Sequence, residues 1–373
     1  MSTKPAKSVK PAKRDGKSAK RDGKSAARST VPALAGGPLL ADVRGLILQA
    51  REQVARAVDT RLSTLHWQIG QRIRRDILKE RRAGYGEQIV SSLATQLEAE
   101  FGRGFGRRNL FRMIRFAEVF PDQRIVSALM TQLGWTHFLH IIPIDDPLKR
   151  DFYAEMCRIE GWNTRTLAKK VQSMLFERTA LSRKPAKLAQ LELKRLRKGD
   201  KLSPDLVFRD PYILDFLGLK DSYAEKDLEA AILREMEAFI LELGVGFSFV
   251  ARQKRMQIDD RDYYLDLLFY HRKLRRLIAI DLKIGDFEAG DKGQMELYLN
   301  WLKRYEREPQ EAEPLGIILC AGKSYQHVEL LELASSGIHV ATYWTKVLPK
   351  KELEGKLHDA VRLARARLER GTD

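Results

Sequence analysis

The stretch YYLDLLFYHRKLRRLIAIDLKIGDF, from Tyr263 to Phe287, decides the architecture of the C-terminal third of this 373-residue chain. Two apolar runs, residues 261–270 and 277–284, are separated by a short polar link, and this spacing predicts a β-hairpin. A further strand-like run at 247–256 comes before them. The three segments together predict an antiparallel meander.

Charged residues interrupt these apolar strands. The period-2 alternation of a strand puts Asp281 and Lys283 on one face of the run 277–284, and Asp266 lies between leucines in the preceding run. A buried carboxylate is costly unless it is paired or bound to a cation. If the hairpin pairs these strands, Asp266 and Asp281 converge on one cation. The alternative, a surface ion pair between Asp281 and Lys283 on an edge strand, stays open.

Two convergent carboxylates and a lysine suit the hydrolysis of a phosphodiester bond. The carboxylates would hold a hard divalent cation, Mg²⁺ with Mn²⁺ as a substitute, which polarises the phosphoryl oxygen and lowers the pKa of a bound water. Lys283 would orient that water or stabilise the charge that builds on the phosphate. The pattern D-x₁₄-D-x-K is weak by itself, and its placement on two adjacent strands strengthens it.

The surrounding elements complete an α/β order. An amphipathic helix is expected at 225–243, a second helix at about 292–305, and apolar strands at 316–321 and 339–344. Helix, meander, helix and strand form an αβββαβ order, in which a mixed sheet is covered on both sides. On the first strand, Arg252, Gln253 and Lys254 are expected to contact backbone phosphates.

Composition favours a polyanionic partner. The chain has 67 Lys and Arg against 50 Asp and Glu, a formal net charge of +17, which suits nucleic acid because each neutralised phosphate releases counterions. Binding to an anionic membrane surface stays open, but no apolar run is long enough for a membrane helix. Cys157 and Cys320 form no metal or disulfide pattern, so a cytoplasmic location is expected.

The N-terminal half has a different organisation. Residues 1–39 form a basic tail, with the repeat KRDGKSA at 13–19 and 20–26, and the tail is expected to be disordered. Residues 40–180 have helical periodicity, and glycines at 102–106 separate two helices as in a helix-turn-helix. Basic side chains on the candidate recognition helix 107–120 and on a second helix after Asn163 predict DNA binding: Arg107, Arg108, Arg112, Arg115, Arg165, Lys169 and Lys170. A solvated face on an ordinary bundle is the alternative.

Residues 181–203 are polar and basic and are expected to form an exposed linker or helical connector. The domain that carries the hairpin is then expected at 204–348, and a helical extension at 349–373. This division predicts an α + α/β fold class, with an all-helical domain followed by the αβββαβ domain.

The chain resembles the YhcG-like family of PD-(D/E)xK nuclease-domain proteins. The resemblance rests on residues 263–287, on GQMELYLNWL at 293–302, on GIILCAGK at 316–323 and, upstream, on residues 134–179. It covers roughly residues 40–345 and implies a restriction-endonuclease-like fold and DNA cleavage. Asp281 stands where this family more often has Glu, so the carboxylate is one methylene shorter.

The resemblance also implies site residues. Asp266 matches the first motif aspartate, and Asp281 and Lys283 match the (D/E)xK element. Gln294 and Tyr298 fit the QxxxY pattern of RecB-like nucleases. Such folds often take a further acidic ligand from the first helix, for which Glu229 is the expected residue.

Three function classes compete. The first is a Mg²⁺-dependent deoxyribonuclease, expected to be an endonuclease; the second is a DNA-binding protein with a degenerate, inactive nuclease fold. The third is a membrane-surface or RNA-binding protein, which leaves the buried carboxylates without a purpose. DNA is the expected partner and a membrane is not; a homo-oligomer and a separate motor protein stay open.

Overall fold

The computed structural model describes residues 37–79, 83–219, 222–333, 335–346 and 348–370. The expectation of a disordered tail therefore lies outside the described residues, except that helix α1 (Gly37–Lys79) begins at its last positions. The chain divides into two units, residues 1–53 and 54–373. Helix α1 starts in the first unit, and everything described below belongs to the second.

The helical part contains more helices than the sequence predicted. The helices expected at 107–120 and after Asn163 are present, and Asn163 caps the second one, because its Oδ1 accepts a hydrogen bond from the amide of Thr166 at 2.9 Å. A side chain at Gly70 would collide with the carbonyl oxygen of Met113, so glycine permits the close approach of α1 to α3. The helices after α1 are α2 (Ala83–Phe101), the 3₁₀ turn η1 (Arg103–Phe105), α3 (Arg107–Val119), α4 (Gln123–Met130), α5 (Trp135–Ile141), α6 (Pro147–Glu160) and α7 (Thr164–Gln172).

Residues 181–203, expected as an exposed linker or helical connector, are folded onto the helical part. They form most of α8 (Ala180–Arg183) and the whole of α9 (Ala186–Gly199), before α10 (Pro204–Val207). Ala189, Leu193 and Leu196 recur at helical spacing on α9 and are buried against α6. The basic composition hid this apolar stripe, because charged residues occupy the other faces of α9.

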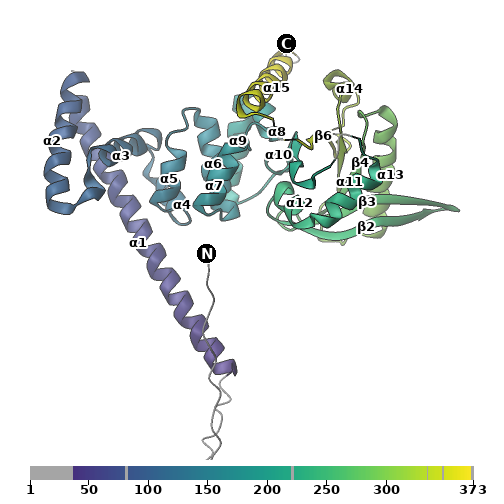
Figure 1. Ribbon diagram of the computed structural model, residues 1–373, viewed down its shortest axis with the longest axis horizontal. Helices are drawn as coiled ribbons and strands as arrows, with labels where there is room; N and C mark the ends of the chain where they lie inside the picture. The colour runs from purple at the N-terminus through teal and green to yellow at the C-terminus, as the bar shows by residue number, and fades with distance from the viewer. Residues whose placement is uncertain (1–36, 80–82, 220–221, 334, 347, 371–373) are drawn as a thin grey trace, which may run out of the picture. The chain divides into compact units, whose positions relative to one another are not determined.

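The C-terminal part contains a six-stranded mixed sheet in the order β1-β6-β5-β4-β3-β2. The strands β2, β3 and β4 pair antiparallel, which confirms the predicted meander, and β4, β5, β6 and β1 pair parallel. The two long strands β2 and β3 form an arm at one end of the sheet (Figure 1). The strands are β1 (Tyr212–Ile213), β2 (Phe247–Ile258), β3 (Arg261–His271), β4 (Arg276–Leu282), β5 (Leu315–Cys320) and β6 (Ile338–Trp344).

Helices cover both faces of this sheet, as the αβββαβ order predicted. One face packs against α11 (Glu225–Arg234) and α12 (Met236–Leu243), which replace the single helix expected at 225–243 because the backbone leaves helical geometry at Glu235. The other face packs against α13 (Ala289–Tyr305). The remaining elements are η2 (Asp215–Leu217), α14 (Tyr325–Leu330) and α15 (Lys350–Arg370). None of the helices in the described ranges could cross a membrane.

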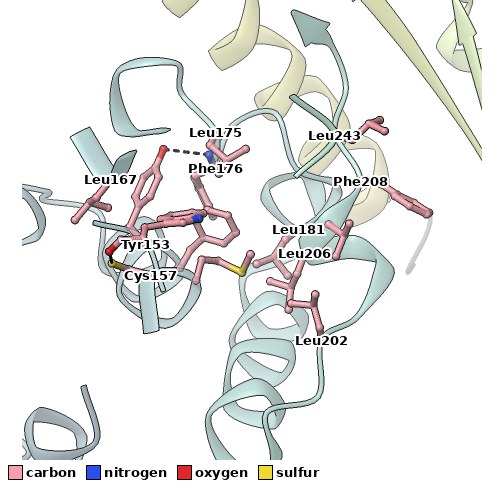
Figure 2. Close-up of a cluster of buried hydrophobic side chains, with 14 of the residues drawn as sticks. Tyr153, Cys157, Leu167, Leu175, Phe176, Leu181, Leu202, Leu206, Phe208 and Leu243 are labelled. Carbon is pink, nitrogen blue, oxygen red and sulfur yellow. Dashed lines mark hydrogen bonds between the residues drawn. The ribbon is translucent and has the colours of Figure 1, made fainter. Parts of the chain in front are cut away.

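A continuous apolar cluster joins the helical part to the sheet. Figure 2 shows Tyr153, Leu167 and Phe176 of the helical part together with Phe208 and Leu243 of the C-terminal part. The amide of Phe176 donates a hydrogen bond to the Tyr153 hydroxyl at 3.1 Å, so the one polar atom of this tyrosine is satisfied inside the cluster. The two parts therefore bury apolar surface on each other within residues 54–373.

Candidate active site

The β3–β4 hairpin places Asp266 and Asp281 across from one another. Leu267 pairs with Ile280 and Leu268 with Ala279, and continuing this register by one residue sets Asp266 opposite Asp281. Both aspartates are buried, at 9% and 3% exposed. The hairpin thus brings together the two carboxylates that the sequence placed on adjacent strands.

Asp266 is held through both of its oxygens. Oδ1 accepts a hydrogen bond from Gln253 Nε2 at 3.0 Å, and Oδ2 accepts one from the amide of Leu282 at 2.8 Å. Gln253 lies on β2 just beyond a register shift and has φ of 42°, a left-handed conformation that few side-chain-bearing residues adopt. Gln253 was expected at a backbone phosphate, and its amide instead fixes the orientation of Asp266.

Asp281 and Lys283 form an ion pair at the end of β4. Lys283 Nζ lies 2.9 Å from Asp281 Oδ2, but this oxygen accepts no well-aligned hydrogen bond. Burial raises the pKa of Asp281 to about 7; Lys283 opposes the rise, whereas Asp266 and Glu225 add to it. Burial also raises the pKa of Asp266, against the lowering effect of its hydrogen bonds.

The two carboxyl groups lie opposite each other, and the charge of Asp266 adds to the rise in the pKa of Asp281. With its pKa raised to about 7, the Asp281 carboxyl can carry a proton near neutral pH when no cation is bound. A divalent cation would take the place of that proton. The donor set of adjacent carboxylate oxygens, one of them buried without an aligned donor, therefore fits a hard cation such as Mg²⁺.

Gln294 and Tyr298 of α13 reach the same site. Lys283 Nζ donates to Gln294 Oε1 at 3.4 Å, and Gln294 Nε2 donates to the Tyr298 hydroxyl at 2.6 Å. That hydroxyl donates to the carbonyl of Tyr264 at 3.0 Å. Tyr298 therefore holds Gln294, and Gln294 holds the lysine, with the proton of the Tyr298 hydroxyl already committed to the backbone.

Glu225 is a site residue that sequence reasoning missed. It is half-buried in the first turn of α11, and burial raises the pKa of its carboxyl, with Asp266 adding to the rise and Lys283 opposing it. Glu229, the residue expected as a further ligand, lies one helical turn later on the same face, which is why periodicity could not separate the two. Across the described ranges, no three Asp, Glu, His or Cys side chains already meet at metal-binding distance.

The predicted DNA-binding residues have different surroundings. Arg107, Arg108, Arg112 and Arg115 of α3 all line one groove of about 700 Å³. On α7, Arg165 and Lys169 are exposed. The third basic residue of α7, Lys170, donates to the carbonyl of Leu241 at 3.4 Å, and burial lowers its pKa to about 8.

On β2, Arg252 is exposed. Its neighbour Lys254 pairs with Glu306 Oε1 at 2.7 Å and lies over the ring of Trp301. Lys254 and Lys170 thus have partners within the chain, whereas Arg252 is exposed and precedes Gln253 on β2.

Comparisons with known proteins give matches over both parts of the chain. Residues 205–358 match a family described as the YhcG PDDEXK nuclease domain, and residues 42–178 match the DUF1016 N-terminal domain. The chain is 32% identical over 358 residues to the protein of Escherichia coli (strain K12) named "Putative nuclease YhcG", covering 87% of this chain and 93% of that protein.

Solved structures match over shorter stretches. A repair endonuclease from Pyrococcus abyssi is 20% identical, with a TM-score of 0.23, over 33% of this chain and 49% of that chain. EndoMS in complex with dsDNA is 17% identical, with a TM-score of 0.26, over 35% of this chain and 49% of that chain. The match thus spans about half the length of each solved chain.

Proposed function

Since the chain belongs to the YhcG family of PD-(D/E)xK nuclease-domain proteins, we propose that it is a Mg²⁺-dependent endonuclease that cleaves DNA through Asp266, Asp281 and Lys283. The observation that carries the proposal is the buried pair of opposed aspartates with a lysine at hydrogen-bonding distance from one of them. An ordinary edge-strand ion pair would be exposed, whereas Asp281 is buried on a strand with neighbours on both sides.

Each residue has a separate role in this proposal. Asp266 and Asp281 hold the cation, which when bound supplies a water of lowered pKa and a positive charge for the phosphoryl oxygen. Gln253 and the amide of Leu282 keep Asp266 in one orientation, so little reorganisation accompanies binding of the cation. Gln294 supports the Lys283 ammonium group, which then stabilises negative charge on the phosphate.

A further carboxylate comes from α11. Glu225 is the better placed of the two candidates, because its carboxyl interacts with both Asp266 and Lys283, and Glu229 one turn later is the alternative. DNA as the substrate is supported by the net charge of +17 and by the arginines of α3.

The test is cleavage of supercoiled and linear DNA by the purified chain in Mg²⁺, Mn²⁺ or EDTA. We expect nicking or linearisation of the circular substrate with either metal and none in EDTA. Asp266→Asn and Asp281→Asn should each abolish cleavage and leave DNA affinity unchanged or slightly higher, because a negative charge near the phosphate is removed. Lys283→Ala should stop turnover, yet Mg²⁺ should still stabilise this variant, since lysine is not a ligand.

If Asp266→Asn and Asp281→Asn both cleave like the wild type at the same Mg²⁺ concentration, these residues are not the active site. The competing function, a DNA-binding protein with a degenerate site, is favoured by the aspartate at position 281 and would give DNA binding without cleavage in any metal.

A further inference from the structure

The groove of about 700 Å³ on α3 differs from an ordinary solvated helix face. Four arginines line it, Glu87 of α2 lies at one side, and Ile142 and Pro143 from the turn between α5 and α6 complete the wall. Its size falls within the range of sites that take a small ligand, roughly 300–1,000 Å³. A helix that reads the major groove must protrude into it, whereas these arginines line an open groove that Ile142 and Pro143 wall on one side.

The charge in the groove is only partly neutralised by the protein. Arg115 pairs with Glu118 at 3.0 Å and with Asp145 at 2.9 Å, and Arg107 lies 3.7 Å from Glu87. Arg112 donates to the neutral side chain of Asn109 at 3.2 Å. In the described part of the chain, Arg108 has no carboxylate within ion-pair distance. Arg108 and Arg112 are therefore the cations available to an anion such as a phosphate.

An aromatic ring lies among these arginines. Phe111 is 36% exposed, and the guanidinium of Arg107 lies 5.3 Å from the centre of its ring. Exposure of an apolar ring to water does not stabilise the fold, but the ring offers a face on which a flat base can stack. Inside a duplex the bases stack on one another, so only an unpaired nucleotide can use such a face.

We propose that this groove binds an unpaired nucleotide of a DNA strand, with a phosphate at Arg108 and Arg112 and the base against Phe111. The choice of DNA rests on the proposed nuclease function; the preference for an unpaired nucleotide rests on the groove itself. The nuclease would then engage DNA where a strand is unpaired, at a single-stranded end or segment.

The test uses full-length protein in EDTA, which prevents cleavage, and fluorescence anisotropy with a labelled thymidine oligonucleotide and with a blunt duplex of the same length. We expect tighter binding of the single strand. Phe111→Ala should weaken that binding about tenfold, the usual effect of losing one stacked base. Arg108→Gln should weaken it and reduce its salt dependence, and Phe111→Trp should retain it.

Two matched controls have the same chemistry outside the groove. Phe101→Ala removes a ring that is 58% exposed on α2, and Arg124→Gln removes an exposed arginine on α4; neither should change single-strand affinity. The proposal is overturned if the duplex binds as tightly as the single strand, if Phe111→Ala binds like the wild type, or if an RNA oligonucleotide binds more tightly than DNA. Asp281→Asn, titrated in the same way, should bind the single strand like the wild type, because binding in EDTA does not depend on the proposed active site. Failure of the groove proposal and failure of the proposed nuclease function can therefore be told apart.

Discussion

Asp266 and Asp281 face each other across the β3–β4 hairpin, although 14 residues separate them in the chain. Their environments differ: Asp266 has an aligned donor on each oxygen, whereas Asp281 is more deeply buried and has only the lysine at its Oδ2. Burial raises the pKa of both carboxyls; the fixed donors oppose the rise at Asp266, whereas the pKa of Asp281 reaches about 7.

Asp281→Glu tests whether the shorter carboxylate is a working ligand. The added methylene restores the residue that this family more often has, so we expect cleavage in Mg²⁺ to be retained or raised. Cleavage gained only in the variant, from an inactive wild type, would instead support the degenerate-site alternative. Asp281→Asn, of the same size as the wild-type residue, is the control that removes the charge.

The pKa of Asp281 has a consequence for stability in the absence of metal. In the unfolded chain its carboxyl has the ordinary pKa of 3.8, and in the folded protein burial raises the pKa to about 7. Between these values the folded state binds more protons than the unfolded state, so the free energy of unfolding falls as pH rises through this window. The contribution is fully present below the lower pKa and lost above the higher one.

Asp281→Asn removes the titrating carboxyl and with it the loss of stability at high pH. In EDTA at pH 8 the variant should be more stable than the wild type, by on the order of 1 kcal/mol, and at pH 4 the difference should vanish. Thermal unfolding between pH 4 and 9 measures this. Mg²⁺ should raise the Tm of the wild type at pH 8 and not that of the variant. Equal pH profiles for the two proteins in EDTA would contradict the assigned environment of Asp281.

Gln253 is expected to act through Asp266. Gln253→Ala removes the donor to Oδ1 and should lower cleavage about 10- to 100-fold, as usual for a group that orients a metal ligand. Gln253→Gly should lose as much activity as Gln253→Ala. It should nevertheless be more stable than the wild type, by up to about 1 kcal/mol, because glycine adopts the positive φ without strain. Gln257→Ala on the same strand is the matched control, since its amide donates only to the carbonyl of Asp259. If Gln253 only stabilised the strand, its substitutions would lower the Tm and the activity together.

The basic residues of α7 should divide into two groups. Gln substitutions at Arg165 and Lys169, which are exposed, should weaken DNA binding and reduce the salt slope by roughly 0.9 for each phosphate that the variant no longer neutralises. Lys170→Gln should lower the Tm and leave the salt slope unchanged, because the Lys170 ammonium group contacts the carbonyl of Leu241. Gel-shift titrations at several salt concentrations, with melting curves, distinguish these results. A salt slope that changed only in Lys170→Gln would reverse the assignment.

Local patterns were sufficient for much of the C-terminal fold. The apolar alternation at 261–284 predicted the hairpin, and the hairpin alone brings Asp266 and Asp281 together. The strand β1 was missed because it is two residues long and pairs only with β6, far along the chain. The break at Glu235 was missed because apolar periodicity continues through it in α11 and α12.

Contacts at the site that join separate elements could not be predicted from the sequence. Gln253 meets Asp266 only through the register shift in β2, which no spacing rule gives. The buried carboxylate of Asp210 pairs with Lys323, 113 residues away, and no sequence pattern links them. Such contacts are decided by how elements pack, and periodicity carries no information about them.

Glu225 and Glu229 allow a matched comparison on one helix. Both are glutamates on the same side of α11, so Glu225→Gln and Glu229→Gln remove the same charge from positions one turn apart. Because the carboxyl of Glu225 is half-buried and interacts with Asp266 and Lys283, we expect Glu225→Gln to lower cleavage by at least about tenfold. Glu229→Gln should leave cleavage within about twofold of the wild type, because it leaves in place the Glu225 charge that acts on Asp281 and Lys283. The two variants should have similar Tm values in EDTA, and only Glu225→Gln should need more Mg²⁺ to reach half of its maximal stabilisation. The reverse result, with Glu229→Gln impaired and Glu225→Gln unaffected in both cleavage and Mg²⁺ titration, would assign the further carboxylate to Glu229, as the sequence alone predicted.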